Sequence, residues 1–323
     1  MSTVSTTALV DGGKAIALSV VFGMVVAFVP VLAILALPLV PIPVAYVTCR
    51  HRLLIGVLAA IGIGALSLLL AGPVNGLLVF LLAALVGIGS GMAIKHGAGR
   101  QKLLLILTGL FLAALVSWGA VGLVNAGMSP ADAVSSVTDQ VIKIGQQTPA
   151  LFGGQQGLNQ LRDTLSMIPY LLPALLLVAA LALSAGMVFL TRRVFDRLGQ
   201  AFPDGLPFRE LRLHFSLAYA MIVGLICYLF SPYISADYSS AVYLTGLNLL
   251  IVSQALFFVQ ALAITHFFLG GFQVSRVKRV IVYTFLVLLQ TTLSLPSWLG
   301  LLDIWIDYRR RFTRRTKPGP GQV

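Results

Sequence analysis

Charged residues are scarce in this sequence. Only 10% of the 323 residues are Asp, Glu, Lys or Arg, whereas a soluble domain carries roughly 25% to cover its surface. Residues of the A, V, I, L, M, F, W, Y and C types make up 58% of the chain, and its mean hydropathy is +0.97. Most of the surface therefore does not face water. This excludes a soluble globular protein and predicts an all-α transmembrane helical bundle in contact with the lipid bilayer.

Cysteine is also rare, and the motifs of common enzyme classes are missing. Cys49 and Cys227 stand in no CxxC or zinc-ligand spacing, which excludes a disulfide framework. HExxH and GxxxxGKS/T do not occur, and GIGSG at residues 87–91 is not a GxSxG nucleophile elbow. We therefore expect no catalytic residue, no metal ligand and no cofactor, and the chain is not predicted to be an enzyme.

Long stretches without a charged residue define the candidate spans. They cover residues 15–49, 53–94, 103–131, 164–191, 213–236, 238–275 and 280–302. At about 20 apolar residues per spanning helix, the composition predicts eight or nine spans.

Two of these stretches are expected to break. As one helix, residues 53–94 would be about 63 Å long, against a hydrocarbon core of about 30 Å, so they must form two helices. We place the break at AGPVNG, residues 71–76. Residues 15–49 are predicted to form a hairpin whose second limb is broken by prolines, at Pro30, Pro38, Pro41 and Pro43.

Basic residues gather between the spans and predict the orientation. The net charge of +12 comes from 22 Lys and Arg against 10 Asp and Glu, in clusters at residues 50–52, 95–102, 192–212, 276–279 and 309–317. By the positive-inside rule the first four clusters face the cytoplasm. We expect a multi-pass protein of the bacterial inner membrane, with no nucleic-acid partner. Residues 280–308 are only about 43 Å long as a helix, so they either cross once, leaving the tail outside, or turn back at Pro296.

Polarity divides the chain into four predicted segments. They are the transmembrane helices 1–126, an external insertion 127–166, the transmembrane helices 167–308 and a basic cytoplasmic tail 309–323. In the insertion, Ser129 and Pro130 are typical of a helix start. Apolar residues then recur at helical spacing, which predicts two amphipathic helices separated by FGGQQG. These either connect spans at the interface or cap the external mouth of the bundle.

The stretch 240–269 is the most polar of the predicted spans. Its polar side chains point in three directions, so we expect this helix to be surrounded by protein rather than lipid. One interpretation is a cavity that binds a small solute, and the other is hydrogen bonding between helices. The candidate ligand-binding residues are Asn248, Gln254, Gln260 and His266, with Gln290 and Thr291 from the last span.

Two acidic residues follow the last span. Asp303 and Asp307 lie four residues apart, and Asp307 precedes Arg311 by four. This spacing predicts an ion-pair ladder on the surface of one helix. Small-residue ridges, Gly56/Ala60/Gly64 and Ala83/Gly87/Gly91, predict close helix packing and are also candidate docking surfaces for other membrane subunits.

Three segments together resemble a known family. ALPLVPIPVAYVTCRHR, LPFRELRLHFSLAY and LSLPSWLGLLDIWIDYRRRF are similar to the YybS-like family of bacterial predicted membrane proteins. That family is similar in its N-terminal helices to the substrate-binding (S) components of energy-coupling factor transporters, and more distantly to MreD-type cell-shape proteins. The resemblance implies an S-component-like bundle with extra helices and an external insertion.

Two functions fit these observations. The first is a small-solute-binding or transport-type component that works with a partner subunit, because the chain has no ATP-binding motif of its own. The second is a non-transporting assembly or scaffold protein of the MreD kind, in which the polar helix only holds the bundle together.

Overall fold

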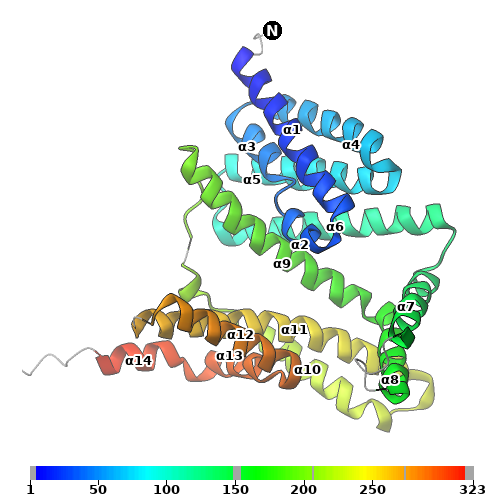
Figure 1. Cartoon of the computed structure of the whole chain (residues 1–323). Helices are drawn as coiled ribbons and strands as arrows, with labels where there is room; N and C mark the ends of the chain where they lie inside the picture. Colours follow the sequence, from blue (N-terminus) through cyan, green and yellow to red (C-terminus); the bar gives the residue numbers. More distant parts are fainter. Residues whose placement is uncertain (1–4, 148–153, 206, 273, 317–323) are drawn as a thin grey trace, which may run out of the picture. The chain divides into compact units, whose positions relative to one another are not determined.

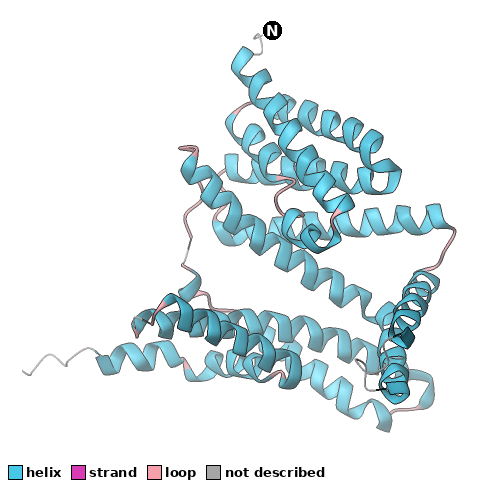
Figure 2. Ribbon diagram, viewed as in Figure 1, coloured by secondary structure: helices cyan, strands magenta, loops and turns pink. Residues whose placement is uncertain are grey.

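The computed structural model describes residues 5–147, 154–205, 207–272 and 274–316, and these are helical apart from short connections, with no strand among them (Figures 1 and 2). The all-α prediction is confirmed. The chain forms two compact units. The first contains residues 1–172 and 176–205, and the second contains residues 173–175 and 206–323.

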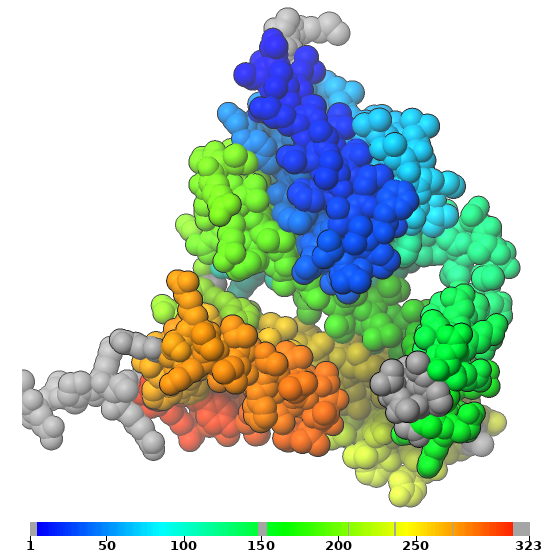
Figure 3. Space-filling view, viewed as in Figure 1, coloured from blue at the N-terminus to red at the C-terminus, as the bar shows by residue number. Residues whose placement is uncertain are grey.

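The first unit begins with a helix capped by a serine. α1 (Thr6–Phe28) starts after Ser5, whose Oγ accepts a hydrogen bond from the Ala8 amide. Pro30 opens α2 (Pro30–Ala36), and two turns later the chain enters α3 (Ile42–Arg50). The predicted hairpin with a broken second limb is confirmed. Ser19 Oγ donates to the Val40 carbonyl over 2.8 Å and thereby fixes α1 to the segment between α2 and α3. α1 and α2 form the dark-blue surface in Figure 3.

The next helix folds back on itself. α4 (Leu53–Leu81) is interrupted at Gly72, which has φ +77° and ψ 174° and precedes Pro73. A Cβ on Gly64 would lie 2.5 Å from Cδ2 of Phe80, although a straight helix would separate the two positions by about 24 Å. Residues 53–71 and 73–95 are therefore antiparallel limbs, each about 28 to 35 Å long. This confirms the predicted break within residues 71–76.

The second limb continues through a π-helical segment, Leu82–Ile88, into α5 (Gly89–Lys95). Its small-residue ridge packs within the chain. A Cβ on Gly87 would lie 2.8 Å from Cβ of Val44, and one on Gly91 would lie 2.6 Å from the Ala45 carbonyl oxygen. Only glycine allows α3 to approach this closely.

Two long helices and the two helices of the insertion complete the first unit. They are α6 (Arg100–Ala126), α7 (Pro130–Gln147), α8 (Gly154–Ser166) and most of α9 (Ile168–Arg197). Ser129 and Asp132 form a capping box at the start of α7, because Ser129 Oγ accepts from the Asp132 amide and Asp132 Oδ2 accepts from the Ser129 amide. The Ser129 hydroxyl also donates to Asp132 Oδ2 over 2.6 Å, and this bond, together with the one from the Ser129 amide, lowers the pKa of Asp132.

The two amphipathic helices of the insertion are confirmed as helices, and they contact each other. Ile142 and Leu158 are buried, and Arg162 pairs with Asp139 over 3.1 Å. The predicted FGGQQG linker is wrong in its second part, because residues 154–157 belong to α8; its first two residues lie outside the described residues. The position of these helices at the membrane surface or the external mouth stays a prediction.

The second unit contains α10 (Ser216–Phe230), α11 (Ala236–Gly271), α12 (Arg276–Leu293), α13 (Leu295–Ile306) and α14 (Tyr308–Thr316). α11 packs against α10 through Gly224 and Gly246, and against α13 through Gly300. α12 and α13 are bent by 100° at Ser294, two residues before Pro296.

Six described helices are long and apolar enough to cross a membrane, or seven if the bent pair α12 and α13 forms one span. Leu53–Lys95 is one of the six, although its limbs double back at Gly72. The prediction of eight or nine spans is not confirmed by this count. A bent pair forms either one broken span or a re-entrant loop. The side of the membrane on which residues 309–316 lie therefore stays a prediction.

Candidate functional site

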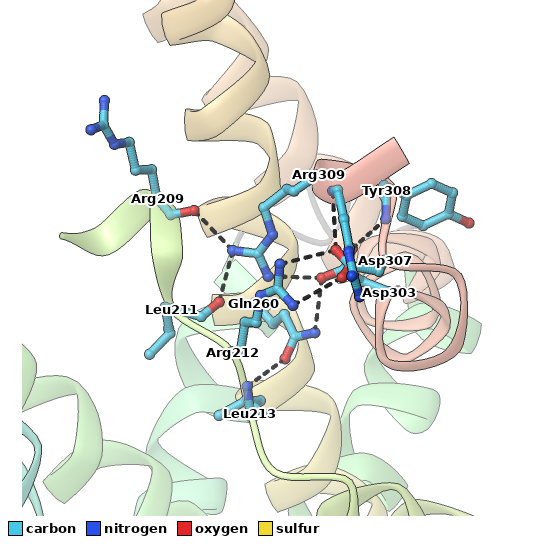
Figure 4. A network of polar contacts seen from close by, with 10 residues as sticks. Arg209, Leu211, Arg212, Leu213, Gln260, Asp303, Asp307, Tyr308 and Arg309 are labelled. Carbon is cyan, nitrogen blue, oxygen red and sulfur yellow. Dashed lines mark hydrogen bonds and ion pairs between the residues drawn. The ribbon is translucent and has the colours of Figure 1, made fainter. Parts of the chain in front are cut away.

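The polar face of α11 lies against a buried ion pair in the second unit (Figure 4). Gln260, at 1% exposure, accepts a hydrogen bond from the Leu213 amide over 3.0 Å through Oε1. Its Nε2 donates to Asp303 Oδ2 over 3.4 Å. The side-chain amide thus joins the connection before α10 to α13, and both of its polar atoms have partners.

Asp303 and Arg309 form the ion pair itself. The guanidinium Nη2 lies 2.8 Å from Asp303 Oδ2, and both residues are 5% exposed or less. Asp303 Oδ1 also accepts from the Tyr308 amide over 3.1 Å. Arg309 Nη1 donates to the carbonyls of Arg209 and Leu211 over 2.8 and 2.9 Å. A buried pair persists only where additional hydrogen bonds compensate for lost hydration, and these contacts supply them.

Asp307 has a different role from Asp303. It has a φ of 48° and ends α13, and its carboxylate accepts two hydrogen bonds from Arg212, of 2.9 and 3.0 Å. Its Oδ1 also accepts from the Arg310 amide at the start of α14. The predicted surface ladder along one helix is therefore wrong, because the helix ends at this residue and Asp303 is buried.

Gln254 and Gln290 meet at Ser297, near the bend between α12 and α13. Gln290 Oε1 accepts from the Ser297 amide over 3.2 Å and lies 2.8 Å from its Oγ. Ser297 Oγ also lies 2.7 Å from the Gln254 carbonyl oxygen, and Ser294 Oγ donates to Gln254 Oε1 over 3.3 Å. These bonds connect α11, α12 and α13.

The remaining candidates have separate partners. Asn248 Nδ2 donates to the Leu244 carbonyl over 2.9 Å, and its Oδ1 accepts from the Ala174 amide over 3.2 Å. His266 Nδ1 lies 2.8 Å from the Tyr283 hydroxyl. Thr291 is exposed and its hydroxyl donates to the Leu288 carbonyl of its own helix. Hydrogen bonding between helices accounts for Gln254, Gln260, Gln290 and His266, and solute binding by the candidate residues stays a prediction.

The first unit holds a cavity of about 460 Å³, within the range of about 300–1,000 Å³ typical of small-molecule sites. Its walls come from α1, from α3 with the residues just before it, and from the C-terminal end of α9. Apolar side chains line one part, including Leu18, Phe22 and Leu39, and charged side chains line the other, including Asp11, Lys14 and Arg50.

The charged end of this cavity is held in place by a small network. His51 Nε2 lies 2.9 Å from Asp11 Oδ2, and Arg50 Nη1 lies 3.8 Å from the same oxygen and donates to the Tyr46 hydroxyl. Lys95 Nζ donates to the His51 carbonyl over 2.5 Å. Two of the predicted basic clusters thus meet at one end of the first unit.

This cavity was not predicted from the sequence. A usable signal was present, because Asp11, Lys14, Leu18 and Phe22 follow one another at steps of three and four residues and so share one face of α1. The opposing wall comes from α3, and nothing in the sequence states which helix packs against that face. Among the described residues, no cluster of three or more His, Cys, Asp or Glu is placed to hold a metal ion.

Comparison with known proteins gives one family and one named relative. A family model described as "Predicted membrane protein (DUF2232)" matches residues 17–304. The chain is similar to "Uncharacterized protein YybS" of Bacillus subtilis (strain 168), with 24% identity over 316 residues, 95% of this chain and 98% of that protein. No solved structure matches the chain. The resemblance to the YybS-like family is confirmed, whereas the likeness to S components stays an expectation.

Proposed function

The chain belongs to the family of predicted membrane proteins DUF2232, so its function lies in or at a membrane, and we propose that it binds a small amphipathic molecule in the cavity of the first unit. In this proposal it is a multi-pass, non-enzymatic, transport-type component of the bacterial inner membrane. GxxxxGKS/T does not occur in the sequence, so energy for transport comes from an ion gradient or from a separate ATPase that acts as a partner subunit.

The shape and lining of the cavity carry the proposal. The cavity of about 460 Å³ combines apolar walls with a few charged side chains at one end, which is the usual composition of a small-molecule site. The polar residues of α11 are weaker support, because Gln254 and Gln260 already have protein partners. We therefore place the ligand against α1 and α3 rather than against α11.

Native mass spectrometry of the purified protein in detergent tests this proposal. We expect a bound molecule to persist with the wild-type protein and to be lost in Leu18→Trp, whose larger side chain fills the cavity. The matched control is Leu69→Trp, because Leu69 is 82% exposed and outside the cavity. Absence of any bound molecule, together with no thermal shift across a panel of metabolites and lipids, would contradict the proposal.

The alternative function is a non-transporting assembly protein of the MreD kind. It is favoured by the hydrogen bonds that connect α11, α12 and α13 through Gln254, Gln290 and Ser297. Such bonds within a membrane contribute about 0.6 kcal/mol each on average, so this unit is suited to holding a fixed shape.

One pair of variants separates the two functions. If the chain only assembles other proteins, Leu18→Trp leaves the cellular phenotype intact, whereas combined Ala replacement of Asn248, Gln254 and Gln260 lowers stability and impairs it. If the cavity binds a ligand, Leu18→Trp impairs the phenotype at normal protein abundance. Immunoblots of membrane fractions and growth of a deletion strain carrying each variant measure the two effects.

A further inference from the structure

The cavity of the first unit has a gradient of polarity along α1. Its lining from this helix begins with Asp11 and Lys14 and ends with Leu18 and Phe22. Asp11 and Phe22 are about 16 Å apart along the helix axis. The lining therefore changes from charged to apolar over a distance comparable to half the hydrocarbon core.

The opposing helix has the same gradient in the reverse direction of the chain. The lining from this side begins with Leu39 and Ile42 and ends with Tyr46 and Arg50. α3 is antiparallel to α1, because Arg50 lies near Asp11 at one end and Ser19 Oγ bonds the Val40 carbonyl toward the other. The charged ends of both walls coincide, and so do the apolar ends.

The charged end carries an excess of positive charge. Asp11 is the acidic residue in the lining, against the two cations Lys14 and Arg50. Its carboxylate is already in contact with His51 at 2.9 Å and Arg50 at 3.8 Å. Lys14 is exposed and the Arg50 side chain is 51% exposed, so both are accessible to a ligand. An anionic group is therefore favoured at this end over a neutral or cationic one.

Further basic residues lie at the same end of the first unit. Lys95 bonds the His51 carbonyl, and the ring of Tyr46 contacts Phe195 of α9 with 5.8 Å between centroids. Arg192 and Arg193 lie three and two residues before Phe195 in α9. Clusters of this kind beside membrane spans attract anionic lipid headgroups.

The apolar walls decide between a lipid and a water-soluble anion. Leu18 is 52% exposed and Leu198 is 53% exposed, and both line the cavity. A small anion dissolved in water would contact only the charged end. An amphiphile contacts both parts, because its headgroup meets the charged end and its acyl chain packs along the apolar walls.

Resting on the proposed function, we infer that the ligand of this cavity is an anionic phospholipid. Its phosphate lies at Lys14 and Arg50, and one acyl chain lies along Leu18, Phe22 and Leu39. By the orientation predicted from the basic clusters, this lipid belongs to the cytoplasmic leaflet.

Lipid binding by native mass spectrometry tests the inference directly. The delipidated wild-type protein is titrated with dioleoyl phosphatidylglycerol and, separately, with dioleoyl phosphatidylcholine, which has the same acyl chains and no net charge. We expect phosphatidylglycerol to bind at least about tenfold more tightly. Equal affinity for the two lipids would overturn the inference.

Variants locate the site. Lys14→Gln combined with Arg50→Gln should weaken phosphatidylglycerol binding about tenfold. It should weaken phosphatidylcholine binding less, because the choline ammonium already offsets the charge of its phosphate, whereas Leu18→Trp should weaken both lipids equally. Lys102→Gln is the matched control, because Lys102 is an exposed basic residue outside the cavity. An equal loss in Lys102→Gln would show a diffuse attraction to basic loops and would contradict a site.

A photoreactive lipid keeps the test independent of variant stability. Phosphatidylglycerol with a diazirine on its acyl chain should crosslink the wild-type protein within residues 18–22 and 39–42. Crosslinks confined to other helices would overturn the inference, as would crosslinks between two copies of the chain through these residues. If a soluble metabolite binds and phosphatidylglycerol does not displace it, the lipid inference is wrong but the proposed small-molecule binding stands. If neither a metabolite nor a lipid binds, both the inference and the proposed function are wrong.

Discussion

Arg309 Nη2 lies 2.8 Å from Asp303 Oδ2, and both side chains are almost completely buried. The same guanidinium donates to the carbonyls of Arg209 and Leu211, about one hundred residues earlier in the chain. One side chain therefore joins three parts of the second unit, namely α13, the start of α14 and the connection that precedes α10.

Removal of one partner of this pair should strongly destabilise the second unit. Arg309→Gln leaves the Asp303 carboxylate buried without its cation, and we expect a loss of about 3–5 kcal/mol in the free energy of unfolding. Thermal unfolding in detergent measures this loss, and amide hydrogen exchange should rise in residues 207–213. Lys278→Gln, an exposed residue outside the network, is the control and should change stability by less than about 0.5 kcal/mol. Similar stability of the two variants would contradict the role assigned to the pair.

The turn at Gly72 offers a test of backbone conformation alone. Its φ is +77°, and no atom lies within 4 Å of the position that a Cβ would occupy. Gly72→Ala should therefore destabilise the first unit by about 1–3 kcal/mol without a steric clash, because φ +77° with ψ 174° is a conformation that essentially only glycine adopts. Gly109→Ala is the matched control, because Gly109 also has open space but sits in α6 with an ordinary helical φ; it should be neutral or slightly stabilising. Equal effects of the two variants on the melting temperature would argue against a strained turn.

The capping box of α7 predicts a dependence on pH. Hydrogen bonds from Ser129 hold the pKa of Asp132 below its ordinary value of 3.8. The folded-state pKa is depressed, so the stabilising effect is present above the unfolded value and is lost as the pH falls through the folded value. Amide hydrogen exchange in residues 130–140 should therefore increase below about pH 4. Asp132→Asn should flatten this dependence, and an unchanged profile in that variant would assign the effect to another acid.

The orientation of the chain can be measured with single cysteines. In a background with Cys49→Ser and Cys227→Ser, an impermeant thiol reagent should modify Gln155→Cys in intact cells and spare Gly99→Cys and Gln200→Cys. The reason is that Lys and Arg near helix ends are rarely moved across the membrane. The clusters that contain residues 99 and 200 have more Lys and Arg than the insertion, which has only Lys143 and Arg162. The opposite labelling pattern would reverse the topology, and the same assay at Thr316 would decide on which side the chain ends.

Features that depend on local chemistry could be predicted from the sequence. The break at Gly72 followed from the length of an uncharged stretch and a Gly-Pro pair. The helix start at Ser129 followed from capping chemistry, which acts over three residues. The chain bends by 100° at Ser294, close to Pro296, and the choice between one crossing and a turn back stays a prediction.

Features that depend on which helices meet could not be predicted. Asp303 and Asp307 have helical spacing, but α13 ends at Asp307, which has a positive φ. The chain changes direction there, and Arg309 then pairs with the buried Asp303 carboxylate. Gln260 was correctly identified as buried in protein, yet its partner at Leu213 lies outside the span. The cavity beside Asp11 was missed for the same reason, because its two walls are brought together only by tertiary packing.

The contacts of Arg309 also order events during synthesis of the chain. The carbonyls of Arg209 and Leu211 have no guanidinium partner until residue 309 has been added, which at about 5–20 residues per second takes roughly 5–20 seconds after residue 209. Within that interval the connection before α10 is held only by contacts to residues made earlier. Its hydrogen bonds to Arg309 form when α14 has been synthesised. Arg309 thus completes the contacts that hold residues 209–211, and a nascent chain that stops before Arg309 should stay sensitive to protease at residues 207–213.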